Sequence, residues 1–139
     1  MSRRKLVATN NLRPRNFAQR ENNDCGVLAL SAVACVDYAV AHAALAAAGR
    51  RNGNGTWLAQ MYKAAKALGI EIGEFKSIRP TKAGAWHATG ANVLDHVPPR
   101  GHYIIGSTNH WFAVVDGVVY DNGGLAPRAR LDGYYVINF

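Results

Sequence analysis

The sequence predicts an α+β fold, with a helical N-terminal half followed by an antiparallel sheet. Two observations indicate this order. Between residues 24 and 69 the chain holds long alanine-rich and leucine-rich segments with helix-capping residues at their ends. After Pro98 and Pro99 it changes to short runs of valine, isoleucine and aromatic residues, which are typical of strands. A chain of 139 residues can bury a stable core without the help of disulfide bonds or a metal ion. We therefore expect a single domain over residues 1–139.

The first helix is expected over residues 25–48. Asp24 suits its N-cap, and Gly49 suits the left-handed position that commonly follows a helix end. Residues 26–48 are apolar enough to raise the question of a membrane span, but ten of them are alanine and Asp37 lies near the middle. A buried central helix explains this segment better, and we expect no membrane span.

The remaining elements follow from caps, breakers and β-rich runs. Thr56 is expected to cap a second helix over residues 57–68, which Gly69 closes. A weaker third helix is expected over residues 90–97, because two prolines follow it. Strands are expected at residues 70–75, 102–107, 110–115, 118–121 and 134–139.

An Asp-Gly pair at 116–117, between two valine-rich runs, predicts a two-residue hairpin turn. Side chains alternate between the faces of a strand, so this turn puts His110 and Asp121 on one face and Asn122 on the other. The predicted register therefore selects Asp121 as the residue that orients His110. A longer turn or a bulge would select Asn122 instead.

Three residues, in the order Gln19, Cys25 and His110, have settings that suit nucleophilic catalysis. Cys25 opens the first helix, and the positive potential at a helix N-terminus favours the thiolate. Gln19 can offer its side-chain amide, beside the Cys25 backbone N–H, to a developing oxyanion. His110, oriented by Asp121, can take the thiol proton.

The other cysteine and histidines receive structural interpretations. Cys35 is expected to be a buried packing residue in the middle of the first helix. His42, His87 and His96 are interpreted as surface or core residues. His102 is a rival base because it also opens a strand, but no carboxylate follows it at hairpin spacing.

The stretch QRENNDCGVLAL resembles the start of the C39-like peptidase group, within the papain-like cysteine peptidase superfamily. The stretch HWFAVVDGVVYDN is similar to the histidine strand of that group. The resemblance implies a papain-like fold, with the cysteine on a central helix and the histidine and aspartate on the sheet. It implies a nucleophile, a base, an orienting acid and an oxyanion donor at Cys25, His110, Asp121 and Gln19 respectively.

The chain departs from that group in two respects. C39 domains are usually fused to a transporter, whereas no membrane span is expected here, and the connection from His110 to Asp121 is shorter than usual. The double-glycine leader specificity of the group is therefore not carried over. A short standalone form resembles proteins encoded by phages or mobile elements.

We therefore expect a cysteine peptidase that hydrolyses a peptide or isopeptide bond in a peptide or protein substrate. The same site would also serve an amidase or acyltransferase, and a non-catalytic papain-like binding protein is an alternative from another class. No cofactor or metal is expected, since the two cysteines form no CxxC motif. Ten helical residues would separate the thiols by about 15 Å, too far for a disulfide.

Positive charge is concentrated at the N-terminus. The first 20 residues carry 6 of the 16 basic side chains and no acid, while the rest of the chain is nearly balanced. Residues 1–15 are expected to form a basic arm. It is either a solvated, partly disordered leader or, through Arg3, Arg4 and Lys5, a tether to nucleic acid. Free thiols and the lack of a signal-peptide core favour a cytoplasmic location. The oligomeric state is not indicated.

Overall fold

The computed structural model describes residues 6–9, 23–78, 88–107, 110–123, 125 and 127–139. It confirms the α+β class: in the described part of the chain, three helices precede an antiparallel five-strand sheet. The helices are α2 (Cys25–Ala34), α3 (Tyr38–Ala47) and α4 (Leu58–Ala67). The strands are β2 (Glu71–Ser77), β3 (His102–Ser107), β4 (His110–Val115), β5 (Val118–Asp121) and β6 (Gly133–Asn138).

A further short strand, β1 (Leu6–Ala8), pairs in parallel with β5 at one edge of the sheet. The strand order is then β1-β5-β4-β3-β6-β2. Residues 6–8 belong to the segment that we expected to be a basic arm, and their backbone continues the sheet next to Asp121, which pairs with Ala8. Arg3, Arg4 and Lys5 lie outside the described residues.

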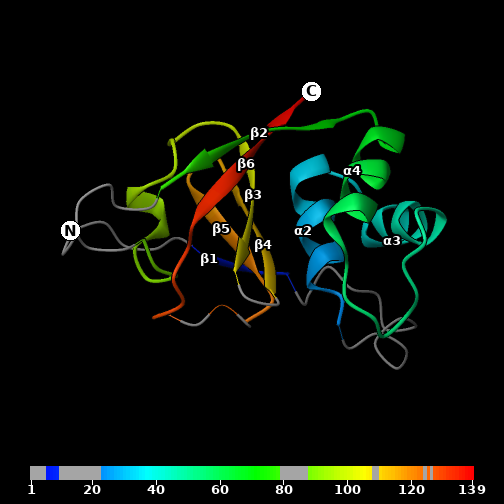
Figure 1. Cartoon of the computed structure of the whole chain (residues 1–139), viewed down its shortest axis with the longest axis horizontal. Coiled ribbons are helices and arrows are strands. Elements are labelled where there is room, and N and C mark those ends of the chain that lie inside the picture. Colours follow the sequence, from blue (N-terminus) through cyan, green and yellow to red (C-terminus); the bar gives the residue numbers. More distant parts are fainter. Residues whose placement is uncertain (1–5, 10–22, 79–87, 108–109, 124, 126) are drawn as a thin grey trace.

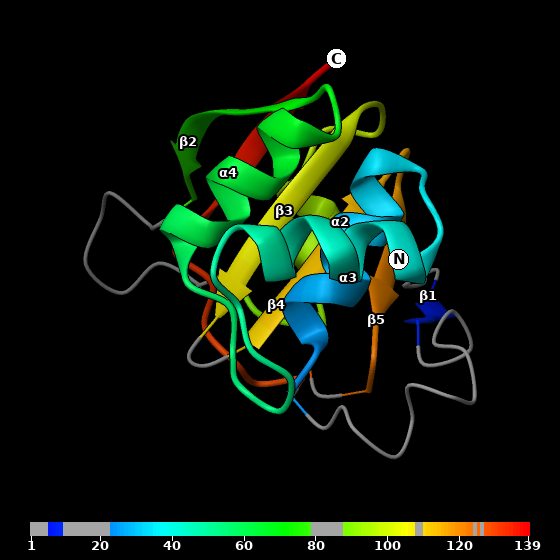
Figure 2. The same ribbon diagram turned by 90° about the vertical axis from the view of Figure 1, so that its right-hand side faces the viewer.

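The sheet is covered on both faces. The helices pack on one face, and the segment around a 3₁₀ turn (Val93–Asp95) lies on the other (Figure 1). Turned by 90°, the three helices lie in front of the strands (Figure 2). Strand alternation explains the two cores, since Ala113 belongs to the helix-side core, whereas Phe112 and Val114 belong to the core beneath the 3₁₀ turn.

The expected single helix over residues 25–48 is wrong. The chain divides into α2 and α3, which are bent by 115° relative to one another. Cys35 ends α2 in the left-handed conformation, with φ 56° and ψ 42°. Ser31 stabilises the break, because its C=O accepts the Val36 N–H at 3.2 Å and its hydroxyl donates to the Val36 C=O at 2.6 Å. Cys35 is therefore exposed, not buried as expected.

In the described part of the chain, no single helix is long and apolar enough to cross a membrane. Among the described helices, α2 and α3 reach the required length and composition only when taken together, and they are bent by 115° relative to one another.

The other helix boundaries agree with their sequence signals to within about a residue. Gly49 and Gly69 follow the ends of α3 and α4 with φ of 107° and 82°. At the start of α4 the N-cap is Trp57 and not Thr56, and the Trp57 N–H donates to Gln60 Oε1 at 2.9 Å.

The helix expected over residues 90–97 is wrong, because only the 3₁₀ turn Val93–Asp95 forms. Asn92 Oδ1 accepts the Thr89 N–H at 2.7 Å. Such a local side-chain bond stabilises a turn in competition with a helix, and the two prolines that follow leave no length for further turns.

The 116–117 hairpin has the predicted register. Ala113 pairs with Tyr120 and Val115 with Val118. Asp116 and Gly117 both have positive φ, 48° and 79°, as a two-residue type I′ turn requires. The Asp116 carboxylate fixes the turn to the residue that precedes β3, since its Oδ1 accepts the Gly101 N–H at 2.8 Å.

We expect Gly117→Ala to lower the free energy of unfolding by about 1–2 kcal/mol, because a Cβ is unfavourable at its left-handed φ. Gly55→Ala is the matched control: its φ is not positive and an added Cβ meets nothing within 4 Å. Urea unfolding of both variants measures the difference. Equal stability of the two would contradict the type I′ turn.

Candidate active site

The candidate site lies where α2 begins beside the first residue of β4. Cys25 is the first residue of α2, His110 is the first residue of β4 and Asp121 is the last residue of β5. The hairpin register brings the last two together, and His110 Nε2 lies 2.5 Å from Asp121 Oδ1. Their side chains are only 11% and 4% exposed, so this pair is shielded from water.

Asp121 is held firmly in its orientation. Its Oδ2 accepts the backbone N–H groups of Gly123 and Leu125, both at 3.1 Å, while Oδ1 faces His110. Because both carboxylate oxygens are engaged, the acceptor for the imidazole is fixed before any substrate arrives.

His110 also interacts with the Cys25 thiol, since the imidazole lowers the pKa of the thiol and the thiol raises that of the imidazole. Since Nε2 faces Asp121, Nδ1 is the ring nitrogen left for the sulfur. The backbone N–H of Trp111 donates to Cys25 Sγ at 3.4 Å, and the His110 ring stacks on Phe112 with centroids 6.2 Å apart. The imidazole is therefore fixed between a thiol and a carboxylate, with its face against the core.

These contacts shift all three pKa values toward the charged forms. Burial by itself raises the pKa of the Cys25 thiol, but hydrogen bonds from His110 and from the Trp111 and Gly26 N–H groups bring it below its usual value. Burial by itself lowers the pKa of His110, but Asp121 and Cys25 together raise it to about 9. Burial also opposes ionisation of Asp121, yet its hydrogen bonds lower its pKa overall. Between the Cys25 pKa and about pH 9, the site therefore holds a thiolate and an imidazolium.

Asp24 occupies the N-cap position of α2, as predicted, but its side chain does not cap the helix. Its Oδ2 instead accepts the Tyr38 hydroxyl at 2.8 Å, and both residues are only 2% exposed. The N–H groups in the first turn of α2 are therefore not taken by the N-cap side chain.

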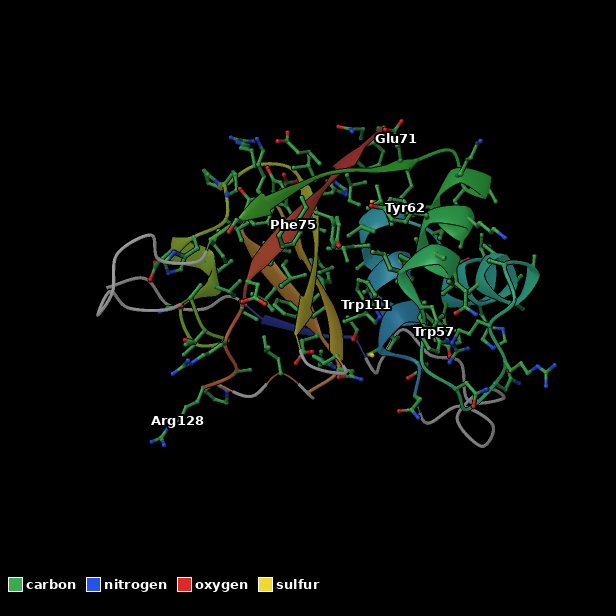
Figure 3. The ribbon with its side chains drawn as sticks, viewed as in Figure 1. Trp57, Tyr62, Glu71, Phe75, Trp111 and Arg128 are labelled. Carbon is green, nitrogen blue, oxygen red and sulfur yellow. The ribbon has the colours of Figure 1, made fainter. Side chains whose placement is uncertain are left out.

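A cleft of about 710 Å³ opens onto Cys25 and His110. Apart from this pair, its described walls carry no ionisable side chain; they consist of Asn23, Gly53, Asn54, Gly55, Thr56, Trp57, Gly106 and Trp111. The Trp111 indole N–H donates to the Thr56 C=O at 3.0 Å and so ties the β4 wall to the loop before α4. Both labelled tryptophans lie near the start of α2 (Figure 3), and Trp57 is 75% exposed.

Gly26 allows this loop to approach the start of α2. A Cβ at Gly26 would collide with the Thr56 side chain. The Cys-Gly pair of the sequence thus places the thiol beside a close contact between α2 and the cleft wall. Sequence reasoning did not find the walls at Thr56, Trp57 and Gly106, because they come from separate loops and strands and form no local motif.

The structure thus brings together Cys25, His110 and Asp121 among the residues predicted for the site. Gln19 lies outside the described residues. Asn122 follows the end of β5, and the carboxylate that bonds to His110 is that of Asp121.

The rival base His102 lies at the opposite end of the sheet from the thiol, paired with Val115. Its Nδ1 is 2.8 Å from the Val33 C=O, and its ring packs edge-on against Phe139. His42 stacks on Tyr38, outside the cleft walls, as a structural residue would.

His96 follows the 3₁₀ turn on the other side of the sheet, and His87 lies outside the described residues. In the part of the chain that the structure describes, no group of three or more His, Cys, Asp or Glu residues could hold a metal ion.

No protein-family model, curated protein or solved structure matches the chain. The geometry of the site and the chemistry of its residues therefore carry the functional interpretation.

We expect iodoacetamide near pH 6 to alkylate Cys25 in preference to Cys35, although Cys35 is the more exposed thiol. The reason is that the thiolate is the attacking species and the pKa of Cys25 is lowered. Asp121→Ala should slow the labelling of Cys25 about tenfold at this pH, since one pKa unit changes the thiolate fraction by that factor. Asn122→Ala is the control and should leave the rate unchanged. Mass mapping of the alkylated peptides measures the labelling of each cysteine. Faster labelling of Cys35 than of Cys25 would contradict the thiolate assignment.

Proposed function

We propose that this chain is a papain-like cysteine peptidase that hydrolyses a peptide or isopeptide bond. The observation that carries the proposal is the His110 imidazole, which bonds to the Asp121 carboxylate and interacts with a thiol at a helix N-terminus, so that the pKa of the thiol is lowered and that of the imidazole is raised. A thiol, a histidine and an orienting acid that interact in this way are the arrangement used for acyl transfer by thiols. The order of a cysteine helix before a histidine strand further supports a papain-like fold.

The proposed reaction begins with the proton of Cys25 on His110. The thiolate attacks the carbonyl carbon, a C–S bond forms, and the carbonyl electron pair moves to oxygen. The Cys25 backbone N–H and the Gln19 amide are the proposed donors to this oxyanion. His110 then gives its proton to the amine as the C–N bond breaks. Water, losing a proton to His110, attacks the thioester and releases the acid with the thiol restored.

Asp121 acts through His110. Its negative charge stabilises the imidazolium in the resting state, and its fixed carboxylate holds Nε2, which leaves Nδ1 for the sulfur. The imidazolium is the proton donor for the leaving amine, so the same contact supports both the resting state and the step that breaks the C–N bond.

The walls of the cleft indicate an uncharged, extended substrate segment next to the scissile bond. The cleft volume of about 710 Å³ is that of a typical binding site. Space for a substrate side chain is open at two wall glycines, since an added Cβ meets nothing within 4 Å at Gly55 and only the Trp111 ring, at 3.8 Å, at Gly106. A charged residue there would lose water without gaining a partner in the described walls.

A digest of a mixed peptide library, read by mass spectrometry, tests the proposed function. We expect the wild type to produce new peptide termini and Cys25→Ala to produce none, because only the thiol can form the acyl-enzyme. Addition of a primary amine tests the acceptor: amide products in place of free acids would assign an acyltransferase. No turnover together with rapid alkylation of Cys25 would contradict the peptidase and favour a binding protein.

Filling the cleft tests whether the substrate lies against Gly106. We expect Gly106→Val to lower kcat/KM for a cleaved peptide by at least about tenfold through steric exclusion, with Gly106→Ala intermediate. Iodoacetamide is small enough to reach Cys25 past either side chain, so the alkylation rate serves as the internal control. Unchanged kcat/KM in Gly106→Val would show that the substrate does not use this wall.

A further inference from the structure

Trp57 presents its indole to water inside the candidate active site. It is 75% exposed, the highest value among the large hydrophobic side chains that the structure describes. It also lines the cleft that opens onto Cys25 and His110, near the start of α2 (Figure 3). An exposed indole leaves a large apolar surface in water, which is unfavourable. A molecule that covers this surface therefore binds with a gain in free energy.

Hydrogen bonds fix the backbone on both sides of the indole. The Trp57 N–H donates to Gln60 Oε1 at 2.9 Å, and the Trp57 C=O accepts the Met61 N–H at 3.0 Å. The preceding Thr56 C=O accepts the indole N–H of Trp111 at 3.0 Å. Because the main chain is already ordered, binding at the Trp57 side chain orders little more of the protein. The indole is thus an exposed side chain on a preorganised backbone.

Two contacts place this backbone beside the nucleophile. The side chain of Thr56 lies so close to Gly26 that an added Cβ at the glycine would collide with it. Trp111 bonds through its indole to Thr56, and its backbone N–H donates to Cys25 Sγ at 3.4 Å. The residue before Trp57 therefore contacts both the residue after Cys25 and the tryptophan that bonds to the sulfur. This brings the indole within reach of a substrate side chain close to the scissile bond.

We propose that Trp57 is a specificity-determining residue, whose indole receives an aromatic side chain of the substrate next to the bond that is cleaved. Aromatic rings pair in offset-stacked or edge-on arrangements, which add to the free energy gained from the area they bury. The inference rests on the proposed function only in naming a cleaved bond. Recognition of an aromatic group beside Cys25 is a property of the resting protein.

The surroundings of Trp57 favour an aromatic group over a charged one. Apart from Cys25 and His110, the described cleft walls hold no ionisable side chain, so a carboxylate or an ammonium group finds no partner of opposite charge there. A cation is the other group that an indole face attracts, but the exposed Arg51 in the same loop adds positive charge. Space for a ring exists before Trp57, since an added Cβ at Gly55 meets nothing within 4 Å.

The test alkylates the protein with four reagents that share one reactive group, the iodoacetyl derivatives of phenylalanine amide, alanine amide, aspartate amide and lysine amide. The thiolate forms a C–S bond to the reagent CH₂ carbon and iodide leaves, so labelling requires no peptide hydrolysis. Mass mapping gives the rate at Cys25, divided by that at Cys35, an exposed thiol outside the cleft walls. This ratio corrects for the intrinsic reactivity of each reagent.

We expect the phenylalanine reagent to exceed the alanine reagent by about fivefold in this ratio, and the two charged reagents to show no such excess. Trp57→Ala should abolish the preference, and Trp57→Phe should keep part of it. Phe139→Ala is the matched control, because this ring is 73% exposed but does not line the cleft, and it should keep the full preference. Far-UV circular dichroism confirms that each variant is folded.

Absence of the preference in the wild type, or its persistence in Trp57→Ala, would overturn the proposal. A preference for the aspartate or lysine reagent that Trp57→Ala abolishes would overturn it too, and would assign the indole to a charged ligand. The peptide-library digest is a separate measurement. A preference that depends on Trp57 in a protein that cleaves no peptide would refute the peptidase and support aromatic recognition. Conversely, a peptidase without the preference would refute the role of Trp57 alone.

Discussion

The hydrogen bond between His110 and Asp121 is the interaction on which the rest of the site depends. It joins two strands of one hairpin, and its existence follows from a turn of two residues with positive φ. One residue more in that turn would move every side chain of β5 to the other face of the sheet. The bond raises the pKa of His110 and thereby allows the imidazolium to lower the pKa of Cys25. The geometry of the two-residue turn thus affects the pKa of Cys25 through the side chains of Asp121 and His110.

The two halves of the fold contribute differently to the site. The sheet supplies a fixed base and acid, whereas the helical half supplies a thiol at the start of α2 and a cleft wall, tied to β4 by the indole of Trp111. These contacts also couple folding to pH. The pKa of His110 rises from 6.5 unfolded to about 9, so its stabilising effect is complete below pH 6.5 and is lost as pH rises through about 9. The pKa of Asp121 is lowered, so its contribution is present above its unfolded value and is lost as pH falls through its folded pKa.

Short-range signals in the sequence predicted the sheet and the pairing of His110 with Asp121, because an Asp-Gly turn and strand alternation fix register locally. The same reasoning missed the break at Cys35. Apolar residues continue across the break since α2 and α3 bury parts of one core, and Asp37, which occupies the N-cap position of α3, resembles a charge within one continuous helix. The orientation of Asp24 was also beyond reach, because a good N-cap residue predicts a cap, whereas in the structure its carboxylate accepts the hydroxyl of Tyr38 from α3 and does not cap α2. The walls of the cleft come from segments that are distant in the sequence, so they could be identified only from the tertiary structure.

The protonation state of His110 tests the central claim most directly. Titration of its imidazole by NMR, in the wild type and in Cys25→Ala, measures the pKa that the thiolate–imidazolium pair requires. The ring should stay protonated through neutral pH and titrate near pH 9 in the wild type, and it should titrate at lower pH once the thiol is removed. A wild-type imidazole that titrates near 6.5, whether or not Cys25 is present, would contradict the ion pair and the mechanism built on it.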